Sequence, residues 1–529
     1  MQRRRTWLGM TILGALALLT LGCSRQSPEA VTSVLRLSQR NEPATLDPAQ
    51  ATLPDEFFIL RAVLEGLVAP DPAGGEPQPA AAERWTVSPD GLTYTFQLRA
   101  NGRWSDDTPV VAADFVESYK RVLTPATAAA KADLFFHVAG AEDFYRGRIT
   151  DFAQTGFSAP DERTVIIRLS RPAPEFLAYV ASGPWLPVNL RTVTEHGRTW
   201  TQPGKFVGNG PFTLTAWDAN QQITVRRRVD HWDAGHIKVN EIHFVALDNG
   251  DAEERAFRSG QVDITMSVPP HRIATYAAET PSRLRATPLH ETRFLAFNTE
   301  RGPLADARVR RALSLAVDRS AIVRSVLQGH QVPTSTYVSP SLGGYRGPTS
   351  PTGSLDEARN LLAAAGFPGG AGFPRLVVST WTSPQVIEAI QQMWRRELGV
   401  QVDLLQREAR VHLAALRSGD YDIGFMTSIP DVADPAKTLE EFRTGQPGNY
   451  PRWSSPEFDT VLASAQTAPD AATRLERLAA AEQILLEAQP VAPLYFNVKN
   501  FLISPGVKGW QEDGLWTRFY RDVSVERTP

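Results

Sequence analysis

Cysteine is nearly absent from the sequence: Cys23 is the only one among 529 residues, so the chain can form no internal disulfide. The short motifs of several enzyme classes are missing as well. There is no Gly-x-Ser-x-Gly elbow, no phosphate-binding loop, no His-Glu-x-x-His pair and no cysteine cluster. These absences exclude a disulfide-stapled scaffold and give no indication of an enzyme.

Long runs of one charge are absent too. The 55 basic and 58 acidic residues give a net charge of −3 and are spread along the chain. Nucleic acid is therefore excluded as the main partner, because phosphate binding needs a concentrated basic face. The hydrophobic fraction of 42% is ordinary for a globular protein, and 529 residues exceed one domain core, so two or more lobes are expected.

Only the amino-terminal end carries a long apolar stretch. Arg3 to Arg5 precede it, it runs from Trp7 to Leu21, and Gly22 and Cys23 follow. This order of positive charge, apolar segment and small residues predicts a secretory signal peptide over residues 1–22. The stretch is shorter than the roughly 20 apolar residues of a membrane-spanning helix, although an uncleaved amino-terminal anchor helix is the alternative.

Leu19 to Cys23 (Leu-Thr-Leu-Gly-Cys) resembles the lipobox of bacterial lipoproteins, with Thr20 where leucine is commoner. The resemblance implies that cleavage occurs before Cys23 and that Cys23 carries the lipid. Residues 23–33 would then tether an exported protein to a lipid bilayer in the periplasm or cell envelope, since several acyl chains anchor a protein firmly. The alternative is an ordinary signal peptide with an incidental cysteine.

Strand-like and helix-like apolar periods alternate along the chain, which predicts an α/β fold. In the amino-terminal third we expect strands at 34–38, 93–98 and 164–169, and helices at 57–67 and 109–122.

The carboxy-terminal half has the clearest boundaries. Ser354 and Glu357 form a capping box at the start of a helix that stops at Gly366. Pro384 begins a second helix, because proline is tolerated where no N–H donor is needed, and Gly399 ends it. One buried apolar stripe is expected on this second helix: Val386, Ile387, Ile390, Met393, Trp394 and Leu398. Three more elements follow: a strand at 400–404, a helix at 471–489 and a buried strand at 491–498.

One internal similarity links two distant regions. Two segments share a plan in which a helix ends, glycine turns the chain and a strand begins. They are residues 256–264 (Ala-Phe-Arg-Ser-Gly-Gln-Val-Asp-Ile) and residues 415–423 (Ala-Leu-Arg-Ser-Gly-Asp-Tyr-Asp-Ile). Matching α/β units in two hinged lobes would enclose a cleft that closes on a ligand. Chance likeness between two common helix-to-strand corners is the alternative.

Several residues that could carry chemistry are interpreted as structural. His231 and His236 border a turn and have poor spacing for a metal. Gly208-Asn-Gly210 precedes a strand and lacks the third glycine of a dinucleotide loop. Asp248–Glu254 lies at a helix amino terminus, where the helix dipole favours acids, with calcium binding as the alternative. We predict no metal site and no cofactor.

Trp104 to Val116 (Trp-Ser-Asp-Asp-Thr-Pro-Val-Val-Ala-Ala-Asp-Phe-Val) resembles the signature segment of the peptide/nickel-type bacterial extracellular solute-binding proteins. The departure is Asp107, where glycine is usual in that family. Further likeness continues in order and spacing from residue 34 to the end, through Leu46–Pro48, Phe57–Gly66, Asn209–Trp217, Val225–Trp232, Asp306–Ala316 and Ala358–Phe367.

The resemblance implies an α/β fold of the periplasmic-binding-protein type, with two lobes, a hinge, a central cleft and a small inserted α+β domain. The first lobe would comprise residues 34–78, 201–305 and 491–529, the inserted domain residues 79–200, and the C-terminal lobe residues 306–490.

It also implies a function. The protein would bind a solute, an oligopeptide or dipeptide, and deliver it to the permease subunits of an ABC-type importer, and it would not be an enzyme. We expect a monomer. One alternative is the same fold with a nickel chelate, oligosaccharide, opine or haem as ligand. The other is a periplasmic hydrolase or chaperone.

In the family, an aspartate after a strand of the C-terminal lobe binds the ammonium of the ligand. The matching segment here is Ser428-Ile-Pro-Asp-Val-Ala-Asp-Pro435, so the resemblance assigns that role to Asp431. A turn or helix-cap acid is the alternative. Asp434 is interpreted as structural. Thr427 and Ser428 precede Asp431 as further ligand contacts, and Ser428 stands where tryptophan is common, which would leave a smaller and more polar wall.

The remaining candidates are less specific. Thr52, Leu53 and Pro54 match the first-lobe segment whose backbone pairs with a peptide as an added strand. Trp381 and Trp453 would line the cleft, with core or rim packing as the alternative. For a ligand carboxylate the candidates are Lys131 and Arg417, although the likeness of Arg417 to Arg258 in the paired corners also suits a structural role.

Overall fold

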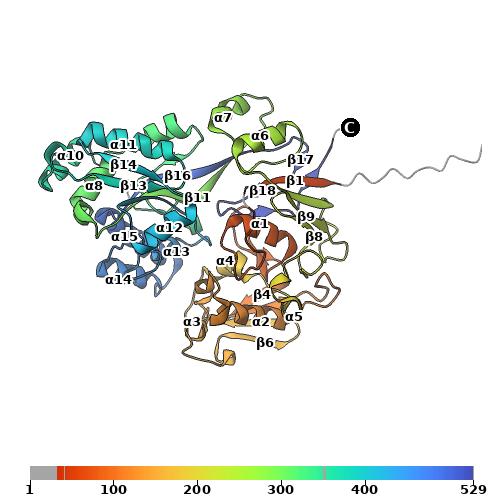
Figure 1. Ribbon diagram of the computed structural model, residues 1–529. Helices are drawn as coiled ribbons and strands as arrows, with labels where there is room; N and C mark the ends of the chain where they lie inside the picture. The colour runs from red at the N-terminus through yellow and green to blue at the C-terminus, as the bar shows by residue number, and fades with distance from the viewer. Residues whose placement is uncertain (1–32, 41, 349–352, 528–529) are drawn as a thin grey trace, which may run out of the picture.

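The computed structural model describes residues 33–40, 42–348 and 353–527 of the chain. The predicted signal peptide, Cys23 and nearly all of the tether lie outside the described residues. Two bodies make up the molecule, and two long strands run between them (Figure 1). Within the described ranges, no helix is both long enough and apolar enough to cross a membrane.

The first lobe is built on a four-stranded sheet in the order β1-β10-β9-β8. Strands β1 and β10 are parallel and the other pairs are antiparallel. The strands are β1 (Val34–Gln39), β8 (Phe212–Asp218), β9 (Gln222–Arg227) and β10 (Glu241–Ala246), and the helices are α1 (Pro54–Val63), α6 (Gly250–Arg258) and α7 (Pro270–Ala277).

The inserted domain carries an antiparallel sheet in the order β4-β5-β7-β6. Its strands are β4 (Ala82–Val87), β5 (Thr93–Leu98), β6 (Phe157–Asp161) and β7 (Thr164–Arg168), and its helices are α2 (Ala112–Leu123), α3 (Ala141–Tyr145), α4 (Phe176–Val180) and α5 (Leu190–His196). The aromatic residues Tyr119, Phe135 and Trp185 are fully buried between this sheet and α2.

The C-terminal lobe is organised around a six-stranded sheet in the order β12-β16-β11-β15-β13-β14. Its strands are β11 (Leu284–Phe297), β12 (Val332–Pro333), β13 (Leu376–Thr380), β14 (Val402–Gln406), β15 (Ile423–Ser428) and β16 (Val491–Leu502). Its main helices are α8 (Ala307–Leu315), α10 (Leu355–Ala364), α11 (Pro384–Leu398), α12 (Ala409–Ser418), α13 (Pro435–Glu440), α14 (Pro456–Ala465) and α15 (Ala471–Ala488).

Alternation along β11 explains how this sheet is covered on both faces. Leu295 and Phe297 belong to the apolar cluster beneath α8, α10 and α11. Their neighbours Phe294 and Ala296 belong to the separate cluster beneath α13, α14 and α15. Because successive side chains of a strand point to opposite faces, a run that is apolar at every position is buried on both sides.

Strands β11 and β16 join the two bodies. They pair along most of their lengths, from Leu284 with Leu502 to Ala296 with Val491, and both reach from the first lobe into the six-stranded sheet (Figure 1). The domain ranges given above assign both strands to the first lobe, whereas their inner halves pair with β12 and β15. Each strand continues through a proline, Pro288 in β11 and Pro493 in β16, and their pairing shifts register between Pro288 and Thr292.

The two similar corners adopt the same conformation. Helix α6 ends at Arg258 and α12 at Ser418, and Gly260 and Gly419 then take left-handed φ angles of 75° and 77°. Ile264 next pairs in parallel with Leu37 of β1, and Ile423 begins β15, which is parallel to β13. The predicted helix and turn are confirmed in both lobes, and the predicted strand in the C-terminal lobe, whereas Ile264 of the first lobe forms isolated β-bridges.

The first lobe and the inserted domain share one hydrophobic core. A single cluster of buried residues contains Leu37 of β1 and Phe58 of α1 together with Trp104 and Phe115 of the inserted domain, the latter on α2. The C-terminal lobe has its own two clusters on either side of its sheet. The inserted domain is therefore packed as part of the first-lobe body.

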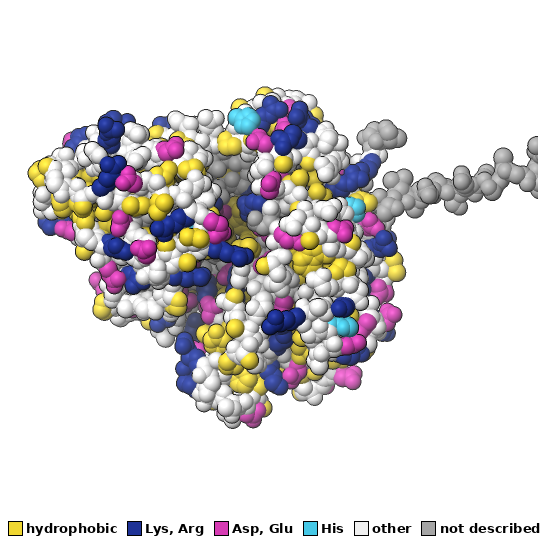
Figure 2. All heavy atoms as spheres, viewed as in Figure 1, with side chains coloured by type: hydrophobic (Ala, Val, Ile, Leu, Met, Phe, Trp, Pro, Cys, Tyr) yellow, Lys and Arg dark blue, Asp and Glu magenta, His cyan; other side chains and the backbone are white. Residues whose placement is uncertain are grey.

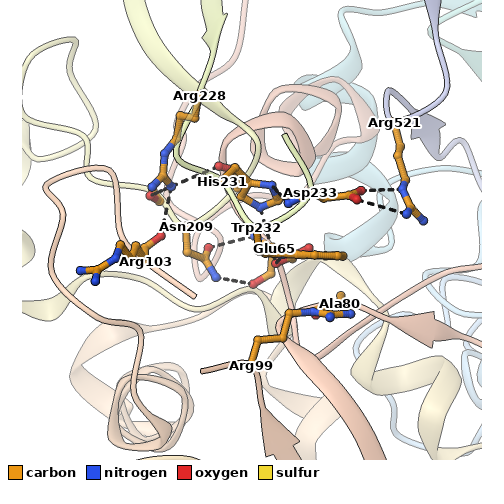
Figure 3. A network of polar contacts seen from close by, with 12 residues as sticks. Glu65, Ala80, Arg99, Arg103, Asn209, Arg228, His231, Trp232, Asp233 and Arg521 are labelled. Carbon is orange, nitrogen blue, oxygen red and sulfur yellow. Dashed lines mark hydrogen bonds and ion pairs between the residues drawn. The ribbon is translucent and has the colours of Figure 1, made fainter. Parts of the chain in front are cut away.

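The turn Gly208-Asn-Gly210 of the first lobe lies between α1 and the inserted domain, and the Gly208 carbonyl accepts a hydrogen bond from the Ser105 N–H of that domain (2.9 Å). A Cβ on Gly208 would lie 2.1 Å from the carbonyl oxygen of Val63, at the end of α1. Asn209 accepts a hydrogen bond from the Glu65 N–H (2.9 Å) and donates one to the Glu65 carbonyl (2.7 Å) (Figure 3). The motif is thus a turn before a strand, as predicted, and its glycines allow α1 to dock against it.

A buried arginine completes the joint. The Arg228 guanidinium is ion-paired with Asp230 and donates hydrogen bonds to the carbonyls of Arg103 and Trp104 in the inserted domain, at 3.1 and 3.0 Å (Figure 3). Trp104 in turn donates its indole N–H to Asp114, which also caps α2. The nearby Asp107 has a φ angle of 66°, a left-handed conformation that explains why glycine is usual at this position.

Candidate functional site

A cavity of about 690 Å³ lies between the two bodies. Figure 2 shows the hollow between them on the surface of the molecule. Its walls come from the start of α1, the hairpin loop between β2 (Val68–Ala69) and β3 (Gln78–Pro79), the inserted domain, the C-terminal lobe and the loop between β18 (Gln511–Glu512) and β19 (Arg518–Phe519). Its size suits a small organic ligand.

Asp431 reaches this cavity from the C-terminal lobe. It lies in the loop that follows β15, the strand between β11 and β13 in the centre of the sheet. Its carboxylate is 31% exposed and forms an ion pair with the Lys131 ammonium of the inserted domain. Asp431 and Lys131 both line the cavity, from opposite sides.

Thr52, Leu53 and Pro54 also line the cavity, at the start of α1. The Glu56 carboxylate accepts hydrogen bonds from the backbone N–H groups of Thr52 (2.7 Å) and Leu53 (3.0 Å). These two donors are therefore occupied, which leaves this segment fewer backbone groups for pairing with an added strand than the sequence led us to expect. The Leu53 side chain is 47% exposed, so it offers apolar surface at the cavity.

Three predicted contacts are not among the residues that line the cavity. Thr427 donates its hydroxyl hydrogen to Glu291, at 2.9 Å. Ser428 is buried and donates to Glu441, at 3.3 Å. The Trp381 ring packs 5.0 Å from His412, centroid to centroid, with the Arg293 guanidinium 5.8 Å above it.

Two other predicted contacts point elsewhere. Trp453 is buried in the C-terminal lobe, where its ring packs 5.1 Å from Phe458. Arg417 is exposed on α12, and its backbone carbonyl accepts a hydrogen bond from Arg452. Neither lines the cavity, so these positions fit the alternatives of core packing and a structural role.

Several lining residues were not predicted from the sequence. Phe57, Phe58 and Arg61 follow Pro54 at helical spacing along the face of α1 that meets the cavity. The Arg61 guanidinium donates to the Ala181 carbonyl (3.0 Å), and within the described ranges no carboxylate lies within ion-pair distance of it. Burial lowers the pKa of Arg61, opposed by the charge of Asp513. The i, i+3, i+4, i+7 pattern from Pro54 is a signal that could have identified these residues.

The carboxy-terminal hairpin supplies another unpredicted part of the wall, residues 512–517. The Glu512 carboxylate forms an ion pair with the buried Lys499 ammonium of β16. Burial lowers the pKa of Lys499 to about 8, although the charge of Glu512 opposes the shift. The cavity wall is therefore tied to the strand that crosses between the bodies.

A second polar cluster bridges the two bodies beside the cavity. Arg474 of α15 lies 2.9 Å from the Asp434 carboxylate and 3.2 Å from Glu175 of the inserted domain. Tyr179 of α4 donates its hydroxyl hydrogen to Asp434, at 2.9 Å. Asp434 also caps α13, which confirms its structural interpretation.

The charge of Glu175 depends on this cluster. Burial alone would raise the pKa of Glu175, but His137 and Arg474 lower it to about 2. The carboxylate is therefore held in its ionised form where the two bodies meet. Next to this cluster, Lys437 of α13 forms a further ion pair with Asp133 of the inserted domain.

In the part of the chain that the structure describes, no group of histidine, cysteine, aspartate and glutamate side chains is placed to hold a metal ion. His231 is buried, and its Nδ1 accepts a hydrogen bond from the Asp233 N–H (3.3 Å). His236 pairs with the same aspartate. The two histidines thus stabilise the turn around Trp232.

An α/β chain with two bodies, two crossing strands and a cavity between the bodies defines a hinged solute-binding protein. Residues 76–450 match the family described as bacterial extracellular solute-binding proteins, family 5. The chain belongs to this family. Membership in a family of binding proteins agrees with the prediction that it is not an enzyme.

Two curated relatives match nearly the whole chain. It is 33% identical to the periplasmic murein peptide-binding protein MppA of Escherichia coli, over 92% of this chain and 91% of the relative. It is 30% identical to the oligopeptide-binding protein OppA of Bacillus subtilis, over 93% of this chain and 92% of the relative.

Solved structures confirm the predicted fold class and bear on the arrangement of the bodies. The structure of the Escherichia coli murein tripeptide binding protein MppA matches with a TM-score of 0.86 at 31% identity, covering 94% of this chain and 99% of that one. The unliganded open form of MppA matches with a TM-score of 0.75, covering 94% and 98%. The two bodies are therefore arranged more as in the former structure than as in the open one.

Proposed function

We propose that this protein binds a peptide in the cavity between its two bodies and delivers it to an ABC-type importer. The single observation that supports this most strongly is the position of Asp431. Its carboxylate is exposed to a cavity that is closed by both bodies, and cationic groups are attracted there in a partly water-excluded site. The names of the relatives MppA and OppA, which include peptide binding, support the same ligand class.

In this proposal the ammonium of the peptide binds Asp431. Arg61, a cavity-lining cation with no carboxylate within ion-pair distance in the described ranges, is available for an anionic group elsewhere on the peptide. Leu53 and Phe57 provide apolar surface for side chains. Contacts from both bodies would favour the closed arrangement, because a ligand shifts a conformational equilibrium by its differential affinity for the two states.

The test is calorimetric titration of tri-alanine into the wild-type protein and Asp431→Asn. Losing a hydrogen-bonded charge pair costs about 2–5 kcal/mol, so the variant should bind roughly 30-fold or more weakly. N-acetyl-tri-alanine, which has no ammonium, serves as the matched ligand and should bind both proteins weakly. Equal binding of the acetylated and free peptides by the wild type would contradict the role of Asp431.

We also propose that Cys23 carries a lipid that anchors the mature protein at the cell envelope, with residues 23–33 as the tether. The lipobox-like Leu19–Cys23 segment supports this. Mass spectrometry of the amino-terminal peptide of protein made in a bacterium should show an acylated cysteine. Cys23→Ser should release the protein from membranes, and an unmodified Cys23 in a membrane-free protein would contradict the proposal.

A further inference from the structure

The proposed ammonium site is already occupied by a cation of the protein. Lys131 immediately precedes a short helical turn (residues 132–135) of the inserted domain, and its ammonium contacts the Asp431 carboxylate across the cavity. The two residues are 300 positions apart in the chain. Lys131 is 18% exposed, so both charges can be reached from the cavity.

Within the described residues, each of these two charges has only the other as an ion-pair partner. Among the described residues, the Lys131 ammonium also lies 5.7 Å from the centroid of the Phe57 ring. The nearby Lys437 is paired with Asp133, and neither of those residues lines the cavity. In this closed arrangement, this end of the cavity is therefore electrically neutral without a ligand.

A ligand that brings only an ammonium to Asp431 would leave the Lys131 charge without a partner in a partly desolvated site, which is unfavourable. A ligand that carries an ammonium and a carboxylate a few bonds apart would satisfy both residues at once. The ammonium would bind Asp431 and the carboxylate would bind Lys131, with two charge-assisted hydrogen bonds replacing one.

We propose that Lys131 determines specificity by selecting peptides whose amino-terminal residue is acidic. The proposal rests on the proposed peptide-binding function and names the class of peptide that suits this site. Asp431 binds the ammonium of that residue, and Lys131 binds its side-chain carboxylate. One charge comes from each body, so the preferred peptide also holds the two bodies together.

The experiment compares the peptides Glu-Ala-Ala and Gln-Ala-Ala, which differ only in the side-chain carboxylate, by calorimetric titration. Wild-type protein should bind Glu-Ala-Ala about 10-fold more tightly or better, since a hydrogen bond to a charged group contributes about 1.5–3 kcal/mol. Lys131→Met should lose this preference or reverse it, because Asp431 is then free for an ammonium alone. Lys131→Arg keeps the charge and should keep the preference.

Lys437→Met is the matched control. It removes a lysine that also forms an ion pair between the two bodies but does not line the cavity, so it should leave the ratio of the two affinities unchanged. Thermal melts of all variants would show whether each is folded.

Two outcomes would overturn the inference. Equal binding of both peptides by the wild type is the first, and an unchanged preference in Lys131→Met is the second. If that variant binds both peptides more tightly by the same factor, Lys131 is only a competitor for Asp431. If the wild type bound neither these peptides nor tri-alanine, the peptide function itself would fail, a result distinct from equal binding.

Discussion

The inserted domain has two neighbours, and it is joined to them by different means. Against the first lobe, it is held by a shared hydrophobic core and by a backbone hydrogen bond from Ser105 to Gly208. Arg228 also donates hydrogen bonds to main-chain carbonyls of the inserted domain (Figure 3). Against the C-terminal lobe, hydrogen bonds and ion pairs between side chains are prominent, such as the ion pair of Glu175 with Arg474 and the hydrogen bond from Tyr179 to Asp434. Side-chain pairs of this kind can separate and be rehydrated, whereas a shared core cannot separate without unfolding.

This difference leads to an expectation about movement. We expect the first lobe and the inserted domain to move as one rigid body and the C-terminal lobe as the other, with β11 and β16 as the connection. Mutations at the first interface should change the stability of the fold, and mutations at the second should change ligand affinity through closure.

The largest effect is expected at Gly208. Gly208→Ala would place a Cβ 2.1 Å from the Val63 carbonyl oxygen, so α1 and the motif could not keep their contact. We expect the free energy of unfolding in urea to fall by about 3 kcal/mol or more. Gly235→Ala is the control, because a Cβ there meets no atom within 4 Å. Equal unfolding midpoints for the two variants would show that the joint is looser than described.

A pair of arginine variants contrasts the two interfaces directly. Arg228→Gln leaves buried carbonyls without donors, so it should lower the free energy of unfolding by about 2–4 kcal/mol with little effect on peptide affinity. Arg474→Gln should do the reverse, because Glu175 and Asp434 would face each other only in the closed arrangement. Its tri-alanine affinity should fall about 10-fold, with a smaller loss of stability than in Arg228→Gln.

Urea unfolding and calorimetric titration of both arginine variants provide the measurement. The same ranking of Arg228→Gln and Arg474→Gln in both experiments would remove the distinction between a fixed and a separable interface.

The pH dependence should come from the separable interface. The pKa of Glu175 is about 2 in this closed arrangement, and an exposed glutamate in an open one would have a pKa near its ordinary value of about 4.5. Because the closed-state pKa is depressed, the stabilisation is fully present above about pH 4.5 and is lost as pH falls toward 2. Tri-alanine affinity should therefore drop by about 10-fold more in the wild type than in Glu175→Gln between pH 5.5 and 3.5. Parallel pH curves for the two proteins would contradict this origin.

The smallest effect is expected from a single hydroxyl. Tyr179→Phe removes the hydrogen bond to Asp434 between the bodies, and tri-alanine should bind a few-fold more weakly. Tyr94→Phe is the control, because it removes a hydrogen bond within the inserted domain, from the Tyr94 hydroxyl to the Ala173 carbonyl (3.2 Å). That control should lower stability without a change in affinity. A larger affinity loss in Tyr94→Phe than in Tyr179→Phe would reverse the comparison.

Local signals in the sequence were sufficient for much of the fold. The predicted strand at 93–98 is β5, and the predicted apolar stripe of α11 is buried at all six positions. One half of the predicted capping box is present, since the Glu357 N–H donates to Ser354 at 3.1 Å. Each of these features depends on residues within one or two turns of each other, where periodicity and capping chemistry leave a readable pattern.

The candidate site was less accessible to the same reasoning. Lys131 and Asp431 form their pair across 300 positions, and Arg474 finds Glu175 across a similar span, so no local pattern marks either contact. Residues 512–517 carry no sequence pattern that indicates a cavity wall, because whether a loop lines a cavity depends on what packs around it. The start of α1 is intermediate: its helical face was readable, but which body it would meet was not.

Distances between spin labels test the central claim most directly. In mature protein beginning at Ser24, cysteine would replace exposed residues in pairs: Thr150 of the inserted domain with Lys238 of the first lobe, and Thr150 with Asn360 of the C-terminal lobe. Electron–electron resonance would be recorded with and without tri-alanine. When peptide binds, we expect the distance between positions 150 and 238 to stay unchanged and the distance between positions 150 and 360 to become shorter. A change in the first pair, or none in the second, would contradict two rigid bodies closing on a ligand.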